Sequence, residues 1–101
     1  MASRLELHEE LCTLLGTRNV YFQPPSSVQM KYPAIVYSLD SLENRHANDS
    51  IYTTDTRYSV TYIDVNPDSV KIREFLKMKH CKFNRFYTAD NLNHYNYTIY
   101  Y

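Results

Sequence analysis

Residues 51–65, IYTTDTRYSVTYIDV, carry the clearest strand pattern of the chain. Tyr58, Val60 and Tyr62 alternate there with the residues between them, so the two sets would point to opposite faces of a sheet. This alternation predicts a sheet with one face more buried than the other. The other elements are placed by working outward from this strand.

Proline marks the ends of two earlier strands. Residues 20–22, VYF, predict a short strand, which the Pro24-Pro25 pair ends because proline lacks the N–H that a strand ladder requires. Residues 34–39, AIVYSL, predict a central strand that Pro33 opens. The residues between these strands form a polar loop. Residues 40–50, DSLENRHANDS, predict a second loop or a hairpin tip.

Residues 4–15 predict the first helix. Ser3 and Glu6 have the spacing of a capping box, in which each side chain satisfies a backbone N–H at the helix start. Leucines then recur at helical spacing, which places them on one face: Leu7, Leu11, Leu14 and Leu15. Gly16, the only glycine, follows this run, where a residue in the left-handed region commonly ends a helix.

Residues 66–79, NPDSVKIREFLKMK, predict the second helix. Asn66 would be its N-cap, Pro67 its first residue, and Asp68 would lie at the positive end of the helix dipole. The expected apolar stripe of this helix consists of Ile72, Phe75 and Leu76.

Two more strands are expected at residues 82–89 and 93–101, joined by a tight turn at Asp90-Asn91. One face of the last strand would carry Tyr95, Tyr97, Ile99 and Tyr101. The order α-β-β-β-α-β-β predicts an α+β fold with two layers, in which two helices pack on one face of a mixed or antiparallel sheet. We expect a single domain over residues 1–101. The other sheet face would be polar but rich in tyrosine.

Composition narrows the function classes. Eleven basic and eleven acidic residues cancel, so the chain lacks the basic excess of a typical nucleic-acid binder. Basic residues do recur between residues 71 and 82, as is typical of a solvated helix face. Eleven tyrosines suit half-buried strand faces and protein interfaces. No signal peptide or membrane span is recognisable, which predicts a cytoplasmic protein.

No set of residues predicts catalysis. The four histidines show no metal-ligand spacing. Asp64 and Asp68 could hold Mg²⁺, but helix capping is the simpler interpretation. His80 and Cys81 would point to opposite sides of a strand. Cys12 is expected to be a buried thiol, and a disulfide with Cys81 stays open. We therefore expect no enzyme, no catalytic or metal-binding residue and no cofactor.

RNA binding by stacked bases is a second class of function to consider. Phe86, Tyr95 and Tyr97 could form an aromatic platform on the sheet. However, the chain has no basic surround and no glycine in an RNA-binding motif, since its only glycine is Gly16.

Three segments together resemble the tail terminator, tail completion and head–tail joining proteins of long-tailed bacteriophages: residues 19–40, 52–69 and 81–101. The likeness extends over residues 5–101 and rests on a distributed pattern. It implies a structural virion protein that forms a ring, usually a hexamer, at the head-proximal end of the tail tube. Such a ring stops tail growth and joins the tail to the head. The alternatives are a head-side connector or stopper ring and a small nucleic-acid-binding domain.

The resemblance also implies partners and a location. Further copies of the chain, the tail tube protein and the connector proteins of the neck would be partners. Genomic DNA would pass through the lumen without specific binding, and no membrane would be involved. The protein would be assembled in the cytoplasm of the infected bacterium and reside in the virion.

We expect the proline-bounded loop 24–32 and the polar segment 44–56 to carry most contacts between neighbours. A ring subunit presents two different surfaces, and proline lowers the ordering cost of a contact loop. The predicted interface residues are Gln29, Met30, Lys31, Tyr32, Arg45, His46, Asn48, Asp49 and Tyr52.

Overall fold

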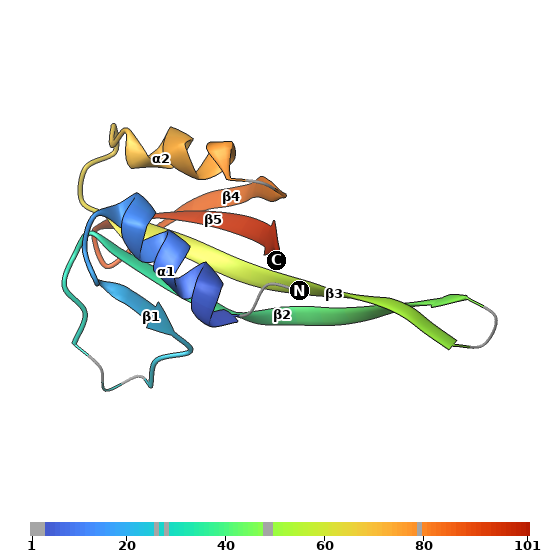
Figure 1. Ribbon diagram of the computed structural model, residues 1–101. Helices are drawn as coiled ribbons and strands as arrows, with labels where there is room; N and C mark the ends of the chain where they lie inside the picture. The colour runs from blue at the N-terminus through green and yellow to red at the C-terminus, as the bar shows by residue number, and fades with distance from the viewer. Residues whose placement is uncertain (1–3, 26, 28, 48–49, 79) are drawn as a thin grey trace.

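A computed structural model describes residues 4–25, 27, 29–47, 50–78 and 80–101, with the side chains of residues 43–47 and 50–55 outside that description. Within these described residues, two helices and five strands follow one another in the predicted order (Figure 1). The sheet is mixed and the helices pack against one of its faces, so the predicted two-layer α+β fold is confirmed.

The five strands line up in the order β1-β2-β3-β5-β4. Their bounds are β1 Val20–Phe22, β2 Ala34–Ala47, β3 Ser50–Asp64, β4 Cys81–Ala89 and β5 Leu92–Tyr100. Only the short β1 runs parallel to its neighbour, and the other pairs are antiparallel. The alternating stretch is the central strand β3, and its residues Tyr58, Val60 and Tyr62 are buried as predicted.

The hairpin of β2 and β3 is longer than predicted. Residues 40–50 were expected to form a loop or hairpin tip, yet β2 continues through Ala47 and β3 begins at Ser50. The register shifts between Leu39 and Ser41, which makes a β-bulge at Asp40. Residues 40–47 show no apolar alternation in the sequence, so the pattern did not predict this part of the strand. Residues 48–49 lie outside the described residues.

Helix α1 (Arg4–Leu15) confirms the first predicted helix. Leu7, Leu11 and Leu15 are buried against the sheet. Gly16 adopts φ +83° and donates its N–H to the Cys12 carbonyl at 2.9 Å, which is the predicted helix end. Ser3, half of the predicted capping box, lies outside the described residues.

The second helix is much shorter than predicted. It comprises α2 (Lys71–Glu74) and the 3-10 turn η1 (Phe75–Lys77). Asn66 is not its N-cap: the Asn66 side chain accepts the Asp68 N–H at 3.0 Å instead. Asp64 accepts the Asn66 N–H in the same way, also at 3.0 Å. These local turns satisfy the backbone without a helix, and the helix begins after them.

The apolar stripe predicted for this helix is partly wrong. Phe75 is fully buried, but Leu76 is half exposed. Lys71 reaches across from α2 and donates from Nζ to the Leu14 carbonyl at 2.9 Å. This bond satisfies one of the free carbonyls at the end of α1 and ties the two helices together.

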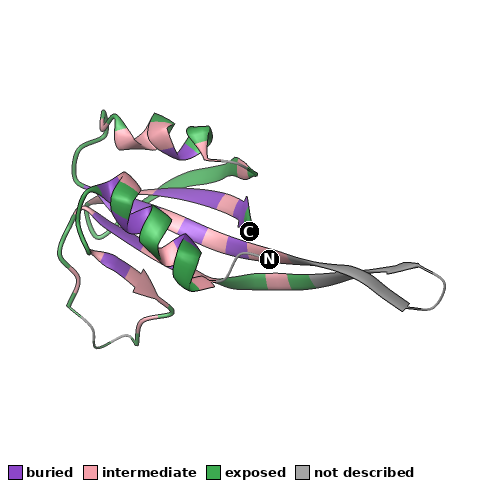
Figure 2. Ribbon diagram, in the orientation of Figure 1, coloured by how far each residue is buried: buried purple, intermediate pink, exposed green. Residues whose placement is uncertain are grey.

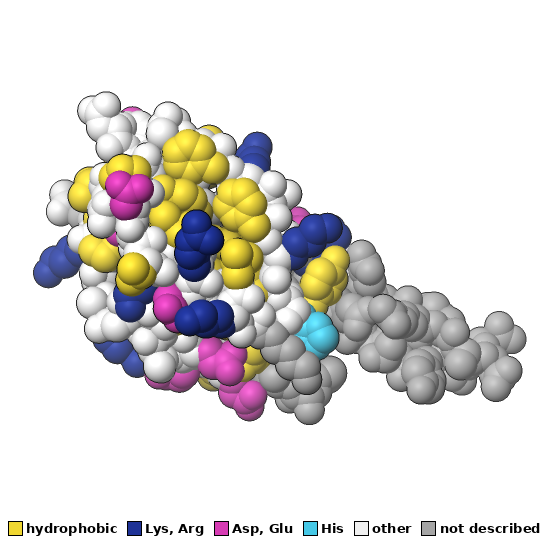
Figure 3. Space-filling model, turned by 90° about the horizontal axis from the view of Figure 1, so that it is seen from above, with side chains coloured by type: hydrophobic (Ala, Val, Ile, Leu, Met, Phe, Trp, Pro, Cys, Tyr) yellow, Lys and Arg dark blue, Asp and Glu magenta, His cyan; other side chains and the backbone are white. Residues whose placement is uncertain are grey.

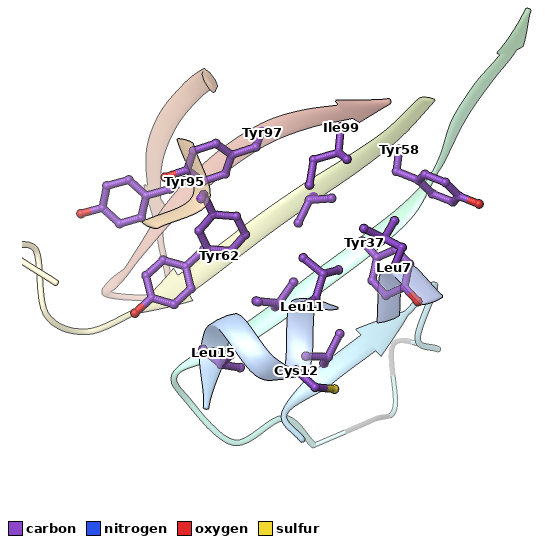
Figure 4. Packing of buried hydrophobic residues seen from close by; sticks show 14 residues of the cluster. Leu7, Leu11, Cys12, Leu15, Tyr37, Tyr58, Tyr62, Tyr95, Tyr97 and Ile99 are labelled. Atoms are coloured by element: carbon purple, nitrogen blue, oxygen red, sulfur yellow. The ribbon is translucent and has the colours of Figure 1, made fainter. Parts of the chain in front are cut away.

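The core is built largely from tyrosine (Figures 2 and 4). Tyr37, Tyr62 and Tyr97 are among its largest fully buried side chains. Their rings lie with Leu7 and Leu11 between the sheet and the helices (Figure 4). Of the four residues predicted to share one face of the last strand, Tyr95, Tyr97 and Ile99 are buried and Tyr101 packs at the edge of the core.

Tyr95 and Tyr97 direct their hydroxyls to the segment that contains α2. Tyr97 donates to the Ile72 carbonyl at 2.6 Å and Tyr95 to the Pro67 carbonyl at 3.2 Å. Burial raises the pKa of Tyr97 to about 12. Buried polar groups need such partners, and here the partners hold α2 against the sheet.

Tyr37 connects the sheet to the other helix. Its hydroxyl lies 2.8 Å from His8 Nδ1, and Arg4 Nη1 donates to it at 3.2 Å. Burial raises the pKa of Tyr37 and lowers that of His8. The tyrosine content that suggested an interface thus serves the fold in these positions.

Candidate assembly interface

The far half of the β2–β3 hairpin projects beyond the rest of the molecule (Figure 1). We name residues 42–47 and 50–56 the projecting ribbon. β5 last reaches β3 where Tyr101 donates its N–H to the Thr56 carbonyl at 3.0 Å. Past that point, no third strand lies beside the ribbon in the described part of the chain. A two-stranded ribbon alone is marginally stable in water.

The ribbon is anchored at its base by an ion pair. Arg57 Nε lies 2.8 Å from Asp40 Oδ2, at the bulge where the ribbon leaves the sheet. A hydrogen bond with Tyr100 and the charge of Asp40 raise the pKa of Arg57. Both charged side chains are partly exposed, so the pair contributes modestly to stability and mainly fixes where the ribbon departs.

The proline-bounded loop lies at the opposite end of the molecule. It returns from the end of β1 to the start of β2 on the outer side of β1 (Figure 1). Lys31 donates its N–H to the Tyr21 hydroxyl at 3.3 Å, and Asn19 Nδ2 donates to the Pro33 carbonyl at 3.3 Å. These bonds pin the returning part of the loop to the edge of the sheet.

The predicted interface residues therefore divide into two groups. Gln29, Lys31 and Tyr32 are exposed and Met30 is half-buried at the loop end. Arg45, His46 and Tyr52 belong to strand segments of the ribbon, but their side chains lie outside the described residues, as do Asn48 and Asp49 entirely. A strand as long as β2, 14 residues, spans roughly 46 Å. The structure does not bring the two groups together.

Sequence reasoning missed a third surface, the outer edge of β4. Every β4 residue except Cys81 is exposed (Figure 2). Phe83 is 42% exposed, Phe86 50% and nearby Leu76 51%. A groove of about 510 Å³ runs between α2 and β4, with Ile72, Leu76 and Phe83 in its walls. Figure 3 shows hydrophobic side chains gathered on the α2 side of the molecule, with basic side chains among and around them.

The aromatic platform expected for RNA binding is not formed. Tyr95 and Tyr97 are buried beneath α2, and only Phe86 of the three predicted residues is half exposed. The register of β4 against β5 shifts between Phe83 and Arg85, so Phe83 and Phe86 both lie beside buried tyrosines. A β-bulge inserts one extra residue into the alternation of a strand. Phe83 and Phe86 are therefore three residues apart although both lie on the same side of the sheet, and this spacing is the sign of the bulge in the sequence.

The sheet face that the helices leave open is polar, as predicted. At its centre, the buried Asn96 Nδ2 donates to Ser59 Oγ and to Thr61 Oγ1, both at 3.0 Å. Asn84 Nδ2 donates in turn to Asn96 Oδ1 at 2.8 Å. The amide has its hydrogen bonds, so this network is a structural tie between strands.

A larger hollow of about 730 Å³ lies between α1 and η1. Leu14, Met78 and Tyr101 contribute its apolar wall, and glutamates from both helices rim it: Glu9, Glu10 and Glu74. Burial and a hydrogen bond to Glu10 raise the pKa of Tyr101 to about 12. The rim of this hollow is acidic, in contrast to the groove beside β4.

Asp64, Cys12 and Cys81 were among the residues considered for metal binding or thiol chemistry. Asp64 accepts hydrogen bonds from Tyr62 and from the Asn66 N–H in a turn that precedes α2. The helix capping predicted for Asp64 and Asp68 is therefore wrong, because α2 begins at Lys71 with Val70 as its N-cap. Cys12 is a buried free thiol and Cys81 a half-buried one, and burial raises the pKa of Cys81 to about 11. Within the described ranges, no three His, Cys, Asp or Glu side chains gather as a metal site would require.

Comparison of the chain with protein-family models, curated proteins and solved structures finds no match. None of the helices in the described ranges combines the length and apolar character that a bilayer crossing needs. A proposal of function for this chain therefore rests on three surfaces of the fold. They are the projecting ribbon, the proline-bounded loop and the outer edge of β4.

Proposed function

We propose that this chain is a structural protein of a long-tailed bacteriophage virion that assembles into a ring. The ring, a hexamer in the family that the sequence resembles, sits at the head-proximal end of the tail tube. It stops tail growth and joins the tail to the head. Its partners are further copies of the chain, the tail tube protein and the connector proteins of the neck.

The observation that carries this proposal is the projecting ribbon. It extends a molecule of 51 × 29 × 23 Å along its longest axis, without support from a third strand in the described part. A ribbon of this kind buries little by itself and gains stability on contact with another molecule. A second copy of the chain is the simplest partner, because it needs no other component.

Ring closure is consistent with the position of the ribbon. A ribbon at one end that meets a different surface of the next copy makes a heterologous contact. Heterologous contacts close into rings when the rotation between neighbours allows it. The formal net charge of zero also fits a ring whose lumen passes DNA without holding it, since phosphate binding depends on clustered cations.

The decisive experiment disrupts the reading frame in its phage and images the products by negative-stain electron microscopy. Over-long tubes without heads are the expected result, because nothing stops tube growth. Tails of normal length beside filled heads would assign a later joining role instead. Intact infectious particles would refute the proposal.

A second experiment uses the purified full-length chain. Mass photometry and class averages of stained particles should show a closed ring with a central hole. The ring should bind the end of a preformed tail tube. Binding to the head connector without the tube would assign the chain to a head-side stopper ring. A monomer at all concentrations up to about 100 μM, well above the Kd of a stable assembly, would argue against any ring.

A further inference from the structure

We propose that the projecting ribbon of one copy lies along the outer edge of β4 in the next copy. The receiving surface, which we name the β4 edge, consists of β4 and the groove between β4 and α2. This inference rests on the proposed ring and names the contact that builds it. Four observations support it: an open strand edge, an apolar groove, a difference in charge between the two surfaces, and two like charges at opposed positions of the ribbon.

The first observation is the open edge of β4. β4 is the last strand of the sheet, and in the described part of the chain only β5 pairs with it. Its nine residues give an edge roughly 30 Å long, and each arm of the ribbon needs roughly 20 Å. An exposed edge of this length readily pairs with a strand from another molecule.

The second observation is that apolar surface is available on both sides. Leu76 and Phe83, which line the groove beside β4, are each exposed by about half, and so is Phe86 of β4 outside the groove. The ribbon begins at Leu42, which is 62% exposed. Contact between these surfaces would remove apolar area from water on both copies.

The third observation is the distribution of charge. Residues 42–56 contain three acidic residues and one basic residue, a net charge of −2. β4, residues 81–89, contains two basic residues and no acidic residue, a net charge of +2, and the groove beside it adds Arg73 and Asp68. In β4 itself, Lys82 and Arg85 are exposed. Charged residues on an edge strand discourage pairing with most strands, so an acidic ribbon is the partner that this edge admits.

The fourth observation is a like-charge pair in the ribbon. The register places Glu43 directly opposite Asp55. Like charges at opposed positions destabilise an isolated antiparallel pair. Cationic side chains of a neighbour would relieve this repulsion, so the ribbon is better suited to a basic surface than to water.

The other surfaces fit the ribbon less well. The hollow between α1 and η1 carries three glutamates against Lys77 in its lining, and no edge strand of the described sheet lines it. The proline-bounded loop 24–33 offers a single charged residue, Lys31. Neither surface provides a strand edge together with positive charge.

The test reverses the charge of each side. The arm variant carries Glu43→Lys and Asp55→Lys, and the edge variant carries Lys82→Glu and Arg85→Glu. Each should raise the concentration needed for half-assembly by about tenfold or more, since it sets like charges against each other. The four substitutions in one chain should restore assembly. An equimolar mixture of the two variants should also restore it, because alternating copies then meet with opposite charges.

A matched control reverses the charges of an exposed ion pair elsewhere, with Glu9→Arg and Arg18→Glu on the α1 side. It should assemble like the natural chain. A natural chain that forms rings while the arm and edge variants assemble equally well would overturn this contact and leave the ring proposal standing. A natural chain that forms no ring would remove the ring proposal itself.

Zero-length carbodiimide coupling locates the contact directly. Rings are assembled from equal amounts of ¹⁵N-labelled and unlabelled natural chain, coupled and analysed by mass spectrometry. The expected product joins Lys82 of one isotopic form to Glu43 or Asp55 of the other. Coupling of these carboxylates to Lys31 instead would place the ribbon on the loop and overturn the inference.

Discussion

The two halves of the β2–β3 hairpin differ in what supports them. In the half that contains Ile35, Tyr37, Val60 and Tyr62, every second side chain is buried under a helix. In the other half, the projecting ribbon, the same two strands continue with no helix and no third strand against them in the described part. One continuous hairpin thus serves the stability of the fold at one end and is available for contact at the other.

The strongest test of the supported half is Tyr97→Ala. Tyr97 is fully buried, stacks on Phe75 with ring centroids 4.6 Å apart and donates to the Ile72 carbonyl. We expect a loss of about 3–5 kcal/mol in the free energy of unfolding, measured by urea denaturation. Tyr97→Phe keeps the ring and should lose only about 1 kcal/mol. A loss in Tyr97→Ala as small as that in Tyr97→Phe would mean that the packing of α2 does not depend on the ring of Tyr97.

The next largest effect is expected at the turn that ends β3. Asp64→Ala leaves the Tyr62 hydroxyl and the Asn66 N–H without their shared acceptor. The expected loss is about 1–3 kcal/mol, because buried donors lose their hydrogen bonds. Asn66→Ala, at an exposed position, is the control and should cost less than about 1 kcal/mol. Thermal melts of both variants decide between these outcomes.

A smaller effect is expected at Gly16. A side chain added there meets only Lys71 Nζ, 4.0 Å away, so the cost comes from the positive φ alone. Gly16→Ala should lose about 1–2 kcal/mol in the free energy of unfolding. Gly16→Asn should lose less, since asparagine tolerates this conformation better. Equal losses in the two variants would point to a contact with Lys71 as the cause.

The smallest effect on the stability of the fold is expected from removing the ribbon. This change tests most directly how the two halves of the hairpin differ. Replacing residues 43–55 with a two-residue Asn-Gly turn should change the stability of the monomer by less than about 0.5 kcal/mol. The same change should abolish ring formation. Urea denaturation at low concentration measures the first quantity, and mass photometry the second. A large loss of monomer stability would show that the ribbon supports the fold.

Much of the supported half could be predicted from the sequence. The alternation around Val60 gave the central strand, and the leucines before Gly16 gave α1. The turn at Asp90-Asn91 was also predictable: both residues adopt positive φ, at 54° and 62°, which asparagine and aspartate tolerate. A helix or strand that buries one face repeats apolar residues at a regular spacing, so buried elements can be predicted from the sequence.

Three features were predicted less well from the sequence, each for a physical reason: the ribbon, the turns before α2 and the β4 edge. Residues 40–47 show no apolar alternation, so the sequence predicted an end of β2 before Asp40 that was too early. Side chains from Asp64 to Ser69 took the hydrogen bonds that a longer helix would have used. Contacts between copies leave no period within one chain, so the order of charge along residues 42–56 and 81–89 was the available signal.

The bulge at Asp40 has a geometric consequence for the proposed ring. A bulge bends its strand and increases the local twist, so the extra residue sets the direction in which the ribbon leaves the sheet. That direction fixes the rotation from one copy to the next. A closed ring accepts only rotations that divide a full circle into equal steps. In the proposed ring, this inserted residue would therefore help to set how many copies complete the circle, and with it the width of the passage through the centre.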